Sequence, residues 1–509
     1  MIKGCCIQCK PQIGLSFRMS VLVLLAFCAT LYILWSWLRP RPHSPPILPG
    51  SLPLIGHAHQ LFGNRKHLWI FLKYIYDYSL RHGGVIEFWL GPHTFYVVTD
   101  PDDIGTVANA CLTKSYFYDF AKDFLNNGLI TADAVTWKSH RKLLNPAFNQ
   151  QVLNTFMNEI NIQARSLVSD LEEKVGKEPF DVRNHFIEFT LKTVSRTSLG
   201  LDTKDQKMID NDYAEAFHSM LNSYCERSQK LWLHFSFVFN ISALKRKQAQ
   251  LKTKLNGYIN PVIRKRKMDL KTKSSTDDND TTRPGKFKPI LDLMLHLADE
   301  KDAFTDDEIR EHLDTFVAAS YDTTSTALTY IMICIGSYKD VQEKIVEEIQ
   351  EVLENADRDV GKEELTKLVY LEAVIKETLR LYPVVPWTGR KIDINVKLKN
   401  YTLKAGTTCF MGIYGLHCHP MWGSDVKEFK PERWLNSATV PDHPNVYSPF
   451  GIGKRYCIGK QYSMMVMKTT LAHLLRRYRI NSNIEDLVSE FDVVLKPVSG
   501  HLLTLSSRT

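Results

Sequence analysis

The residues best suited to chemistry lie in one segment near the C-terminus, PFGIGKRYCIG, over residues 449–459. A cysteine in such a segment can ligate a haem iron as a thiolate, and an arginine can meet an acidic haem propionate. An aromatic ring would shield the sulfur from water, and glycines would allow a tight turn and a close approach of the porphyrin. The alternative is a buried structural cysteine. It is the weaker interpretation, because five positions of the segment fit the motif together. The positions that fit F-x-x-G-x-R-x-C-x-G are Phe450, Gly453, Arg455, Cys457 and Gly459.

A helix is predicted directly after this cysteine, over residues 460–478. Cys457 would then lie close to a helix N-terminus. The helix dipole and the free backbone amides at that end favour a thiolate over a thiol. The thiolate is the ionisation state that an iron ligand needs, so the predicted helix supports the chemistry of the motif.

A second chemical segment lies inside the longest predicted helix. That helix begins with Thr305 and Glu308 as a capping box and continues to about Gly336. Within it, AASYDTTS at residues 318–325 places an acid beside two hydroxyls, which is unfavourable in an apolar helix unless the groups are used. Oxygen activation would use them, because it needs protons in a site closed to water.

We assign to Thr323 a hydrogen bond to the bound oxygen molecule and to Asp322 the supply of protons. The alternative is that the threonine side chain bonds only to a nearby carbonyl of its own helix.

The two segments resemble those of the cytochrome P-450 superfamily. The segment around Cys457 is similar to its haem-binding loop, and residues 319–324 are similar to its A-G-x-D-T-T motif, with Ser320 in place of the usual glycine. The similarity is closest to the microsomal family 4 group, as judged from FYDFAKDFLNNGLITAD and TDDEIREHLDTFV. It covers nearly the whole chain after the N-terminal apolar segment.

Further segments match the superfamily in the expected order. Glu377 and Arg380 fit E-x-x-R, and Arg433 fits the arginine of its P-E-R segment. The resemblance implies that these three residues lock the core behind the haem and take no part in the chemistry. Residues 417–420, HCHP, fit no complete set of metal ligands and align with the usual H-R-D-P of the superfamily.

Three residues are candidates for holding the haem propionates. Trp137 and Arg141 match W-x-x-x-R, and their spacing places them on one helix face. The resemblance implies that both hold a propionate, and Arg390 is a third candidate. A basic rim on the thiolate side would suit an acidic reductase and comprises Lys138, Lys142, Lys454 and Lys460.

Short strands are predicted near both ends of the chain and helices in between. One hairpin is predicted from residues 84–90 and 94–98, a β region over 401–413, and a terminal hairpin over 493–505 around Ser499 and Gly500. The predicted fold class is mainly α with small β-sheets, an α+β arrangement. The resemblance implies the cytochrome P-450 fold, preceded by one N-terminal transmembrane helix.

The N-terminus carries the targeting signal. Residues 1–18 form a basic extension, and residues 19–38, which contain no charge, are long enough for a transmembrane anchor. A cleaved signal peptide is the alternative. Residues 39–56 form a proline-rich hinge and residues 57–509 the catalytic domain. The resemblance implies a single-pass protein of the endoplasmic reticulum membrane whose catalytic domain faces the cytosol.

Charge and cysteine usage narrow the class of protein. The net charge is +8, and residues 241–290 carry fourteen Lys and Arg against four Asp. We predict a flexible basic loop at about 268–288 and no nucleic-acid binding, because aromatic residues are not interleaved with the charges. Ten cysteines without a paired framework indicate a reducing compartment.

The predicted function is a membrane-anchored haem-thiolate monooxygenase. It would insert one oxygen atom from O2 into an apolar substrate, which is fatty acid-like, a terpenoid, a steroid or a xenobiotic. The resemblance implies NADPH-cytochrome P-450 reductase as the electron donor, with cytochrome b5 as an optional one. The alternatives are a reductase-independent isomerase or dehydratase of peroxides and a non-catalytic haem or lipid carrier.

The predicted cofactor is haem b, held without a covalent bond apart from the iron ligand Cys457. Many family 4 members carry a glutamate that can become esterified to a haem methyl. The aligned residue here is Ala319, whose methyl group offers no oxygen nucleophile.

Overall fold

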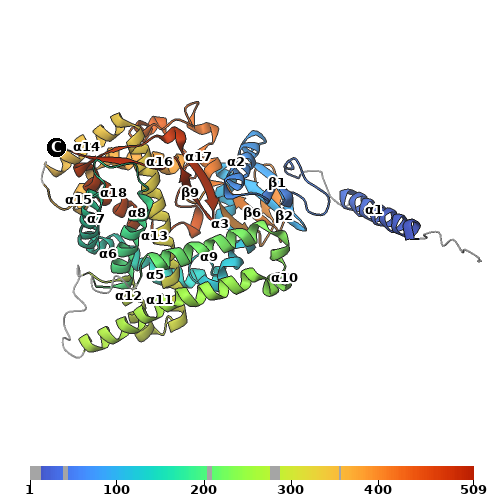
Figure 1. The fold of residues 1–509 in the computed structure, drawn as a ribbon, viewed down its shortest axis with the longest axis horizontal. Coiled ribbons are helices and arrows are strands. Elements are labelled where there is room, and N and C mark those ends of the chain that lie inside the picture. The colour runs from blue at the N-terminus through green and yellow to red at the C-terminus, as the bar shows by residue number, and fades with distance from the viewer. Residues whose placement is uncertain (1–12, 38–43, 203–208, 275–286, 355–356, 509) are drawn as a thin grey trace, which may run out of the picture.

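The structure, a computed structural model, describes residues 13–37, 44–202, 209–274, 287–354 and 357–508. Figure 1 shows helices around a long central helix, a small sheet at one side, and an N-terminal helix that projects from the body. The predicted fold class, mainly α with small β-sheets, is confirmed.

The α-helices of the described residues follow one another along the chain with strands between them. They are α1 (Ile13–Trp37), α2 (Arg65–Arg81), α3 (Pro101–Ala110), α4 (Lys122–Leu125), α5 (Ala134–Leu144), α6 (Gln150–Thr155), α7 (Met157–Glu172), α8 (Arg183–Val194), α9 (Asn211–Gln229), α10 (Ser236–Ile241), α11 (Ala243–Ser274), α12 (Ile290–Lys301), α13 (Asp306–Ser337), α14 (Lys339–Leu353), α15 (Lys362–Lys367), α16 (Val369–Leu381), α17 (Ile413–His417) and α18 (Lys460–Arg477).

The strands form one four-stranded sheet in the order β1-β2-β6-β3 and three two-stranded sheets. The predicted hairpin is confirmed, because β1 and β2 are antiparallel with Leu90 opposite His93. Strand β6 then pairs in parallel with β2 and antiparallel with β3. The strands are β1 (Val85–Leu90), β2 (His93–Val98), β3 (Thr388–Lys391), β4 (Val396–Lys397), β5 (Thr402–Leu403), β6 (Thr408–Met411), β7 (Tyr478–Asn481), β8 (Val488–Asp492), β9 (Val494–Ser499) and β10 (Thr504–Ser507).

The predicted terminal hairpin over 493–505 is wrong in its pairing. The chain does turn at Gly500, which has a φ of 67°. A Cβ there would lie 1.9 Å from the backbone oxygen of Asp486, so only glycine fits. However, β9 pairs with β8, and β10 pairs with β7. The turn residues mark the bend but do not determine which strand lies beside which.

The predicted basic loop at about 268–288 is wrong for its first part. Helix α11 continues to Ser274, and residues 275–286 lie outside the described residues. In the segment predicted as a loop, Leu270 packs partly buried against the main hydrophobic core. Before it, apolar side chains at helical spacing give the helix a buried face. These side chains belong to Leu255, Ile259, Val262 and Ile263.

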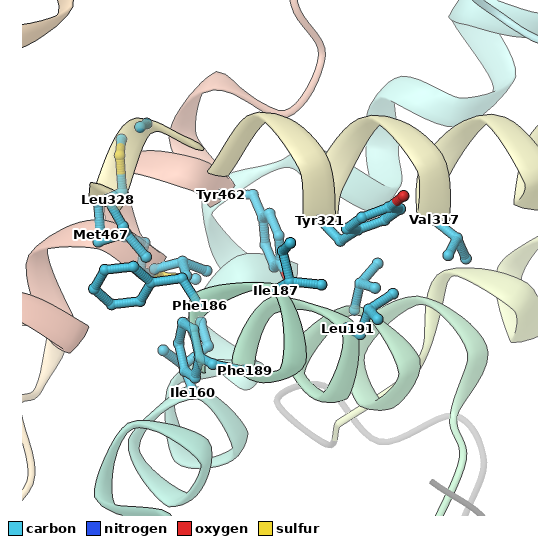
Figure 2. Packing of buried hydrophobic residues seen from close by; sticks show 14 of the residues in the cluster. Ile160, Phe186, Ile187, Phe189, Leu191, Val317, Tyr321, Leu328, Tyr462 and Met467 are labelled. Carbon is cyan, nitrogen blue, oxygen red and sulfur yellow. The ribbon is translucent and has the colours of Figure 1, made fainter. Parts of the chain in front are cut away.

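Helix α13 is the long central helix of Figure 1. The predicted capping box is confirmed, since Glu308 N donates to Thr305 Oγ1 and Thr305 N donates to Glu308 Oε2. The middle of the helix is buried, and Figure 2 shows Val317 opposite Leu191 of α8. The capped end and the packed middle together fix where residues 318–325 lie.

Helix α1 covers the apolar segment 19–38 as far as Trp37, so the helical prediction is confirmed there. Its large apolar side chains are exposed, as at Leu22 and Val23. Within the described residues, no helix has the length and apolar character required to cross a membrane. The prediction of a transmembrane helix is therefore not confirmed, and residues 1–12 and 38–43 lie outside the described part of the chain.

Asp314 on α13 is a fully buried carboxyl group. Neither of its oxygens has a hydrogen-bond partner within the described residues, and the nearest cation, Arg310, is 3.7 Å away. Burial raises the pKa of Asp314 to about 7, and the opposing effect of Arg310 is smaller. The folded protein therefore holds a proton at this site that the unfolded chain loses.

Replacing Asp314 with asparagine should remove part of the pH dependence of stability. The unfolded carboxyl loses its proton near pH 3.9, whereas the folded one keeps it to about pH 7. Between these values the folded state binds more protons, so the free energy of unfolding falls as the pH rises. We expect the free energy of unfolding of Asp314→Asn, measured in urea, to rise relative to that of the parent by about 2–3 kcal/mol as the pH increases from 5 to 8. Asp299→Asn, at an exposed position of α12, is the control, and parallel slopes for the Asp314 variant and the parent would contradict the assignment.

Candidate functional site

A cavity of about 540 Å³ lies between α13 and the segment that carries Cys457. A volume of this size with mostly apolar walls suits a small molecule or a cofactor. It brings together nearly all of the predicted site residues, and of these only Gly453 is not part of the wall. The predicted residues in the wall are Trp137, Arg141, Asp322, Thr323, Arg390, Phe450, Arg455, Cys457 and Gly459.

The loop before α18 holds Cys457 by its backbone. Cys457 N donates to Phe450 O at 2.8 Å, which closes the turn. Gly453 lies behind this turn with a φ of 66°, and a Cβ there would lie 2.8 Å from the oxygen of Ala108. At Gly459, a Cβ would meet only the sulfur of Cys457 within 4 Å, at 3.9 Å. The two glycines thus have different roles, since Gly453 shapes the turn and Gly459 leaves space beside the sulfur.

The ionisation of Cys457 differs from the prediction. Burial raises the pKa of its thiol, while the Gly459 amide, Arg141 and Lys460 lower that pKa by less. The amide acts in the predicted direction, but the helix N-terminus does not by itself produce a thiolate. A metal ion at the sulfur would reverse the balance, because a coordinating thiol is deprotonated.

Neutral partners hold two arginines in the cavity wall. Arg455 donates to the backbone oxygen of Ala132 at 2.7 Å, and its guanidinium lies 4.5 Å from the ring centroid of Trp137. Arg141 donates to the backbone oxygen of Tyr456 at 2.9 Å. These contacts orient the side chains and leave their charges uncompensated.

Arg390 is held in the same way on β3. It is 1% exposed, and it donates to Thr388 Oγ1 and to the backbone oxygen of Gly389, both at 3.1 Å. The three sequence-predicted cations therefore meet at one cavity from α5, β3 and the loop before α18.

Lys114 is a fourth cation in the wall that sequence reasoning missed. Its backbone pairs with Arg390 across a β-bridge, and burial, Arg390 and Arg455 all lower the pKa of its ammonium group. Burial and then Arg390 lower the pKa of Arg455 to about 9. No motif marks Lys114, because it meets the other cations only through the fold.

This group of cations fits an anionic cofactor. Among the described residues that line the cavity, Asp322 is the one acid, and its carboxylate pairs with other residues. An anion placed beside Arg390, Arg455 and Lys114 would remove their mutual repulsion. The two propionates of a haem supply such charge, and a haem seated there would place its iron on the side of Cys457.

The residues assigned to oxygen chemistry lie in the same wall. Thr323 Oγ1 donates to the backbone oxygen of Ala319 at 2.7 Å, so the local helix bond considered as an alternative is present. Asp322 is 4% exposed, and its Oδ1 lies 3.1 Å from His218 Nε2 and 3.4 Å from Lys496 Nζ. Burial alone would raise the pKa of Asp322, but Lys496 and then His218 outweigh it and lower that pKa to about 2.

A buried ionic network lies outside the cavity wall. Arg380 donates to both oxygens of Glu377, at 2.8 and 2.9 Å, and Arg433 donates to the same carboxylate at 2.9 Å. Trp434 Nε1 and Lys430 N add hydrogen bonds at 3.0 Å. Glu377 and Arg380 are fully buried and Arg433 nearly so, which places them as structural ions.

This network reaches the Cys457 loop through His417. Arg380 donates to the backbone oxygens of His417, Val426 and Glu428. His417 Nε2 accepts from the backbone amide of Ser448, the residue before the predicted haem-binding segment. Burial lowers the pKa of His417 to about 3, so the ring stays neutral and can accept this bond.

Comparisons with known proteins agree with this geometry. A family model described as Cytochrome P450 matches residues 45–504. Cytochrome P450 4V2 of Mus musculus is 31% identical over 93% of this chain and 91% of its own length. Probable cytochrome P450 4s3 of Drosophila melanogaster is 33% identical over 91% of this chain and 92% of its own length.

A solved structure, the crystal structure of a cytochrome P450 named CYP102L1, resembles this fold. It has a TM-score of 0.76 and 23% sequence identity, and the likeness covers 92% of this chain and all of that chain. At this identity the likeness shows the shared fold.

Glu377→Gln should destabilise the protein and loosen the loop that carries Cys457. Removing one partner of a buried ionic network costs about 3–5 kcal/mol, because the two arginines lose their counter-charge. We expect a lower urea midpoint and a smaller fraction of purified protein that contains haem. Glu428→Gln, in the segment whose backbone Arg380 binds, is the control, since that side chain is exposed and only its backbone contacts Arg380. Haem content and a midpoint equal to those of the control would contradict the structural role.

Proposed function

Because the chain belongs to the cytochrome P450 family, we propose that it inserts one atom of O2 into an apolar substrate with NADPH electrons that a reductase delivers. The protein is a cytochrome P450 monooxygenase, close to family 4. The observation that supports the specific proposal is the cavity whose wall combines Cys457, the group of cations, and the pair Asp322 and Thr323.

The cofactor is haem b with a cysteine thiolate as iron ligand. We assign the ligand to Cys457, whose side chain is exposed at the cavity. Cys225 also lines the cavity, but it is 4% exposed and burial raises the pKa of its thiol to about 12. When bound, the haem supplies the iron chemistry that activates oxygen.

The propionates of that haem would take their charge partners from Arg141, Arg390, Arg455 and Lys114, with Trp137 beside Arg455. The cofactor is held without a covalent link to α13. Ala319 lines the cavity where a glutamate would be needed for an ester, and its methyl group has no nucleophilic atom.

Thr323 and Asp322 are proposed to handle protons on the α13 side of the cavity. The hydroxyl proton of Thr323 is used by the bond to Ala319 O, so its oxygen is left as an acceptor for a water in the cavity. Asp322 is the neighbouring acid, and its carboxylate can take a proton and pass it to that water. Ser320, which also lines the cavity, stands where the family usually has glycine.

The remaining wall suits an apolar substrate. Aromatic rings from separate elements line it, which favours a fatty acid-like chain, a terpenoid, a steroid or an apolar xenobiotic. These rings belong to Phe71, Phe117, Phe217, Phe410 and Phe491.

A reductase-independent isomerase or dehydratase of peroxides is the second candidate among enzymes. It would need no proton supply from Asp322 and Thr323, so their position in the wall favours the monooxygenase. Product formation that depends on NADPH and a reductase supports the monooxygenase, and turnover of a peroxide without either supports the alternative. Substrate binding without oxygen consumption would instead support a carrier.

The electron donor is proposed to dock on the Cys457 side. The basic rim predicted from the sequence is exposed, and positive charge around the entrance to an iron ligand attracts an acidic partner. Its residues are Lys138, Lys142, Lys454 and Lys460. NADPH-cytochrome P450 reductase fits this rim, and cytochrome b5 is a further donor of the same charge type.

Attachment to the endoplasmic reticulum membrane is proposed to use α1. Its described side chains from Met19 to Leu34 include many large apolar groups that are exposed, and burial in lipid would remove them from water. The catalytic body would then face the cytosol, where reduced cysteines persist.

Cys457→His should abolish the spectral signature of a thiolate ligand. The reduced carbonyl complex of the parent should show a red-shifted Soret band, since only a thiolate donates enough charge to the iron. Cys225→Ala tests a second cysteine of the cavity wall and should keep the band. The same red-shifted band in Cys457→His would exclude Cys457 as the ligand.

Removal of residues 1–38 should weaken membrane association and leave haem binding intact. The residues of the cavity wall all come from later segments, so the cofactor site does not need α1. We expect the truncated protein to leave the membrane fraction in high salt, measured by sedimentation and haem content. A shorter truncation, residues 1–12, keeps α1 and should stay in the membrane fraction. Loss of haem in the long truncation would show that α1 belongs to the catalytic body.

A further inference from the structure

The carboxylate of Asp322 is the meeting point of three elements. Asp322 lies on α13, His218 comes from α9, and Lys496 comes from β9. His218 Nε2 and Lys496 Nζ approach the same oxygen, Oδ1, at 3.1 and 3.4 Å. The carboxylate that borders the cavity is thus bound on its far side by two groups that the sequence motifs do not include.

Lys496 has a fixed position between two acids. Its Nζ lies 3.2 Å from Asp492 Oδ1 on β8, and the other oxygen of Asp492 accepts from Arg65 of α2 at 2.9 Å. The side chain of Lys496 is 7% exposed. Because it is enclosed and paired on both sides, Lys496 neutralises charge and has little access to solvent protons.

His218 has a different environment. Its side chain is 26% exposed, and its ring lies 5.9 Å from that of Tyr321. His218 is not part of the cavity wall, so its exposed portion faces away from the cavity. Nδ1 forms no hydrogen bond with the described residues, whereas Nε2 reaches Asp322. One ring therefore joins solvent to the carboxylate.

The state of Asp322 makes such a neighbour necessary. A carboxyl group with a pKa of about 2 is ionised at neutral pH and carries no proton to donate. It can act in oxygen chemistry only as a relay that receives a proton and releases it at once. The donor must be a group that exchanges protons with solvent, and an imidazole ring can accept a proton at one nitrogen while it releases one from the other.

We propose that His218 is the residue through which solvent protons reach Asp322 and then the cavity. This inference rests on the proposed monooxygenase function and adds a proton-transfer residue to it. Lys496 is a positioning residue that holds the carboxylate in place.

The transfer balances without any further reactant. Nδ1 of His218 takes a proton from solvent, so one N–H bond forms as one O–H bond of the solvent breaks. Nε2 gives its proton to Oδ1 of Asp322, so one N–H bond breaks and one O–H bond forms. The carboxyl group passes this proton to water beside Thr323 and becomes a carboxylate again. Exchange with water then returns the imidazole to its first tautomer.

The test compares His218→Gln with the parent, both reconstituted with reductase and given dodecanoic acid as probe. Glutamine keeps an amide that can contact Asp322 but cannot take up a proton and pass it on. We expect product per NADPH to fall by at least about 10-fold and peroxide to rise. That ratio should also lose its dependence on pH, because glutamine does not exchange a proton with solvent. Binding of the probe, followed by the spectral shift of the haem, should stay within about 2-fold of the parent, because His218 is outside the cavity wall.

His296→Gln is the matched control, because this exposed histidine on α12 also pairs with an acid, Glu300. It should behave as the parent at every pH. If the product formed per NADPH in His218→Gln equals that of the parent at every pH, the proposal is overturned.

A second measurement does not need turnover. The infrared difference between the parent and Asp322→Asn isolates the carboxylate stretch of Asp322, and this band should shift in His218→Ala, which removes the hydrogen bond from Nε2. An unshifted band would also overturn the proposal. If the parent consumes no NADPH with a member of any of the four proposed substrate classes, the proposed function fails, and the infrared measurement still decides whether His218 acts on Asp322.

Discussion

Like charges that share a poorly hydrated space repel one another. The cavity wall of this protein holds a group of cations that are not paired with a carboxylate of the described residues. Lys114, Arg141, Arg390 and Arg455 reach the cavity from separate parts of the chain and are held by carbonyls, hydroxyls and aromatic rings. The arrangement becomes favourable only when an anion lies among them. An acidic haem bound there would complete the charge balance of this wall and so stabilise the folded chain.

Buried carboxyl groups show how position decides the role of one chemical group. Glu377 is enclosed by two arginines and serves the architecture. Asp322 is paired with Lys496 and His218 and stays ionised at the cavity. Asp314 has no hydrogen-bond partner within the described residues, and burial raises its pKa, so its carboxyl group keeps its proton and stays neutral. Three acids on two helices thus have three different surroundings: two arginines around Glu377, a lysine and a histidine beside Asp322, and burial without a hydrogen-bond partner for Asp314.

The sequence predicted correctly those features that depend on residues close together in the chain. The capping box at Thr305, the helix after Cys457 and the first hairpin all follow from local patterns, and the structure confirms them. The terminal hairpin failed because a glycine turn does not choose the partner of a strand. Lys114 and His218 could not be predicted from the sequence, because the role of each depends on contacts with residues over a hundred positions away.

The contacts of Arg380 with the backbone of residues 417–428 also affect which substitutions this segment tolerates in evolution. Its guanidinium recognises the backbone oxygens of His417, Val426 and Glu428, and a backbone oxygen is the same for every amino acid. The loop can therefore exchange side chains at Val426 and Glu428, and at Cys418 and His419, without disturbing the anchor. The resemblance predicts H-R-D-P at residues 417–420, and this freedom is consistent with HCHP at that place. Evolutionary drift in this loop is tolerated as long as the path of the main chain is kept.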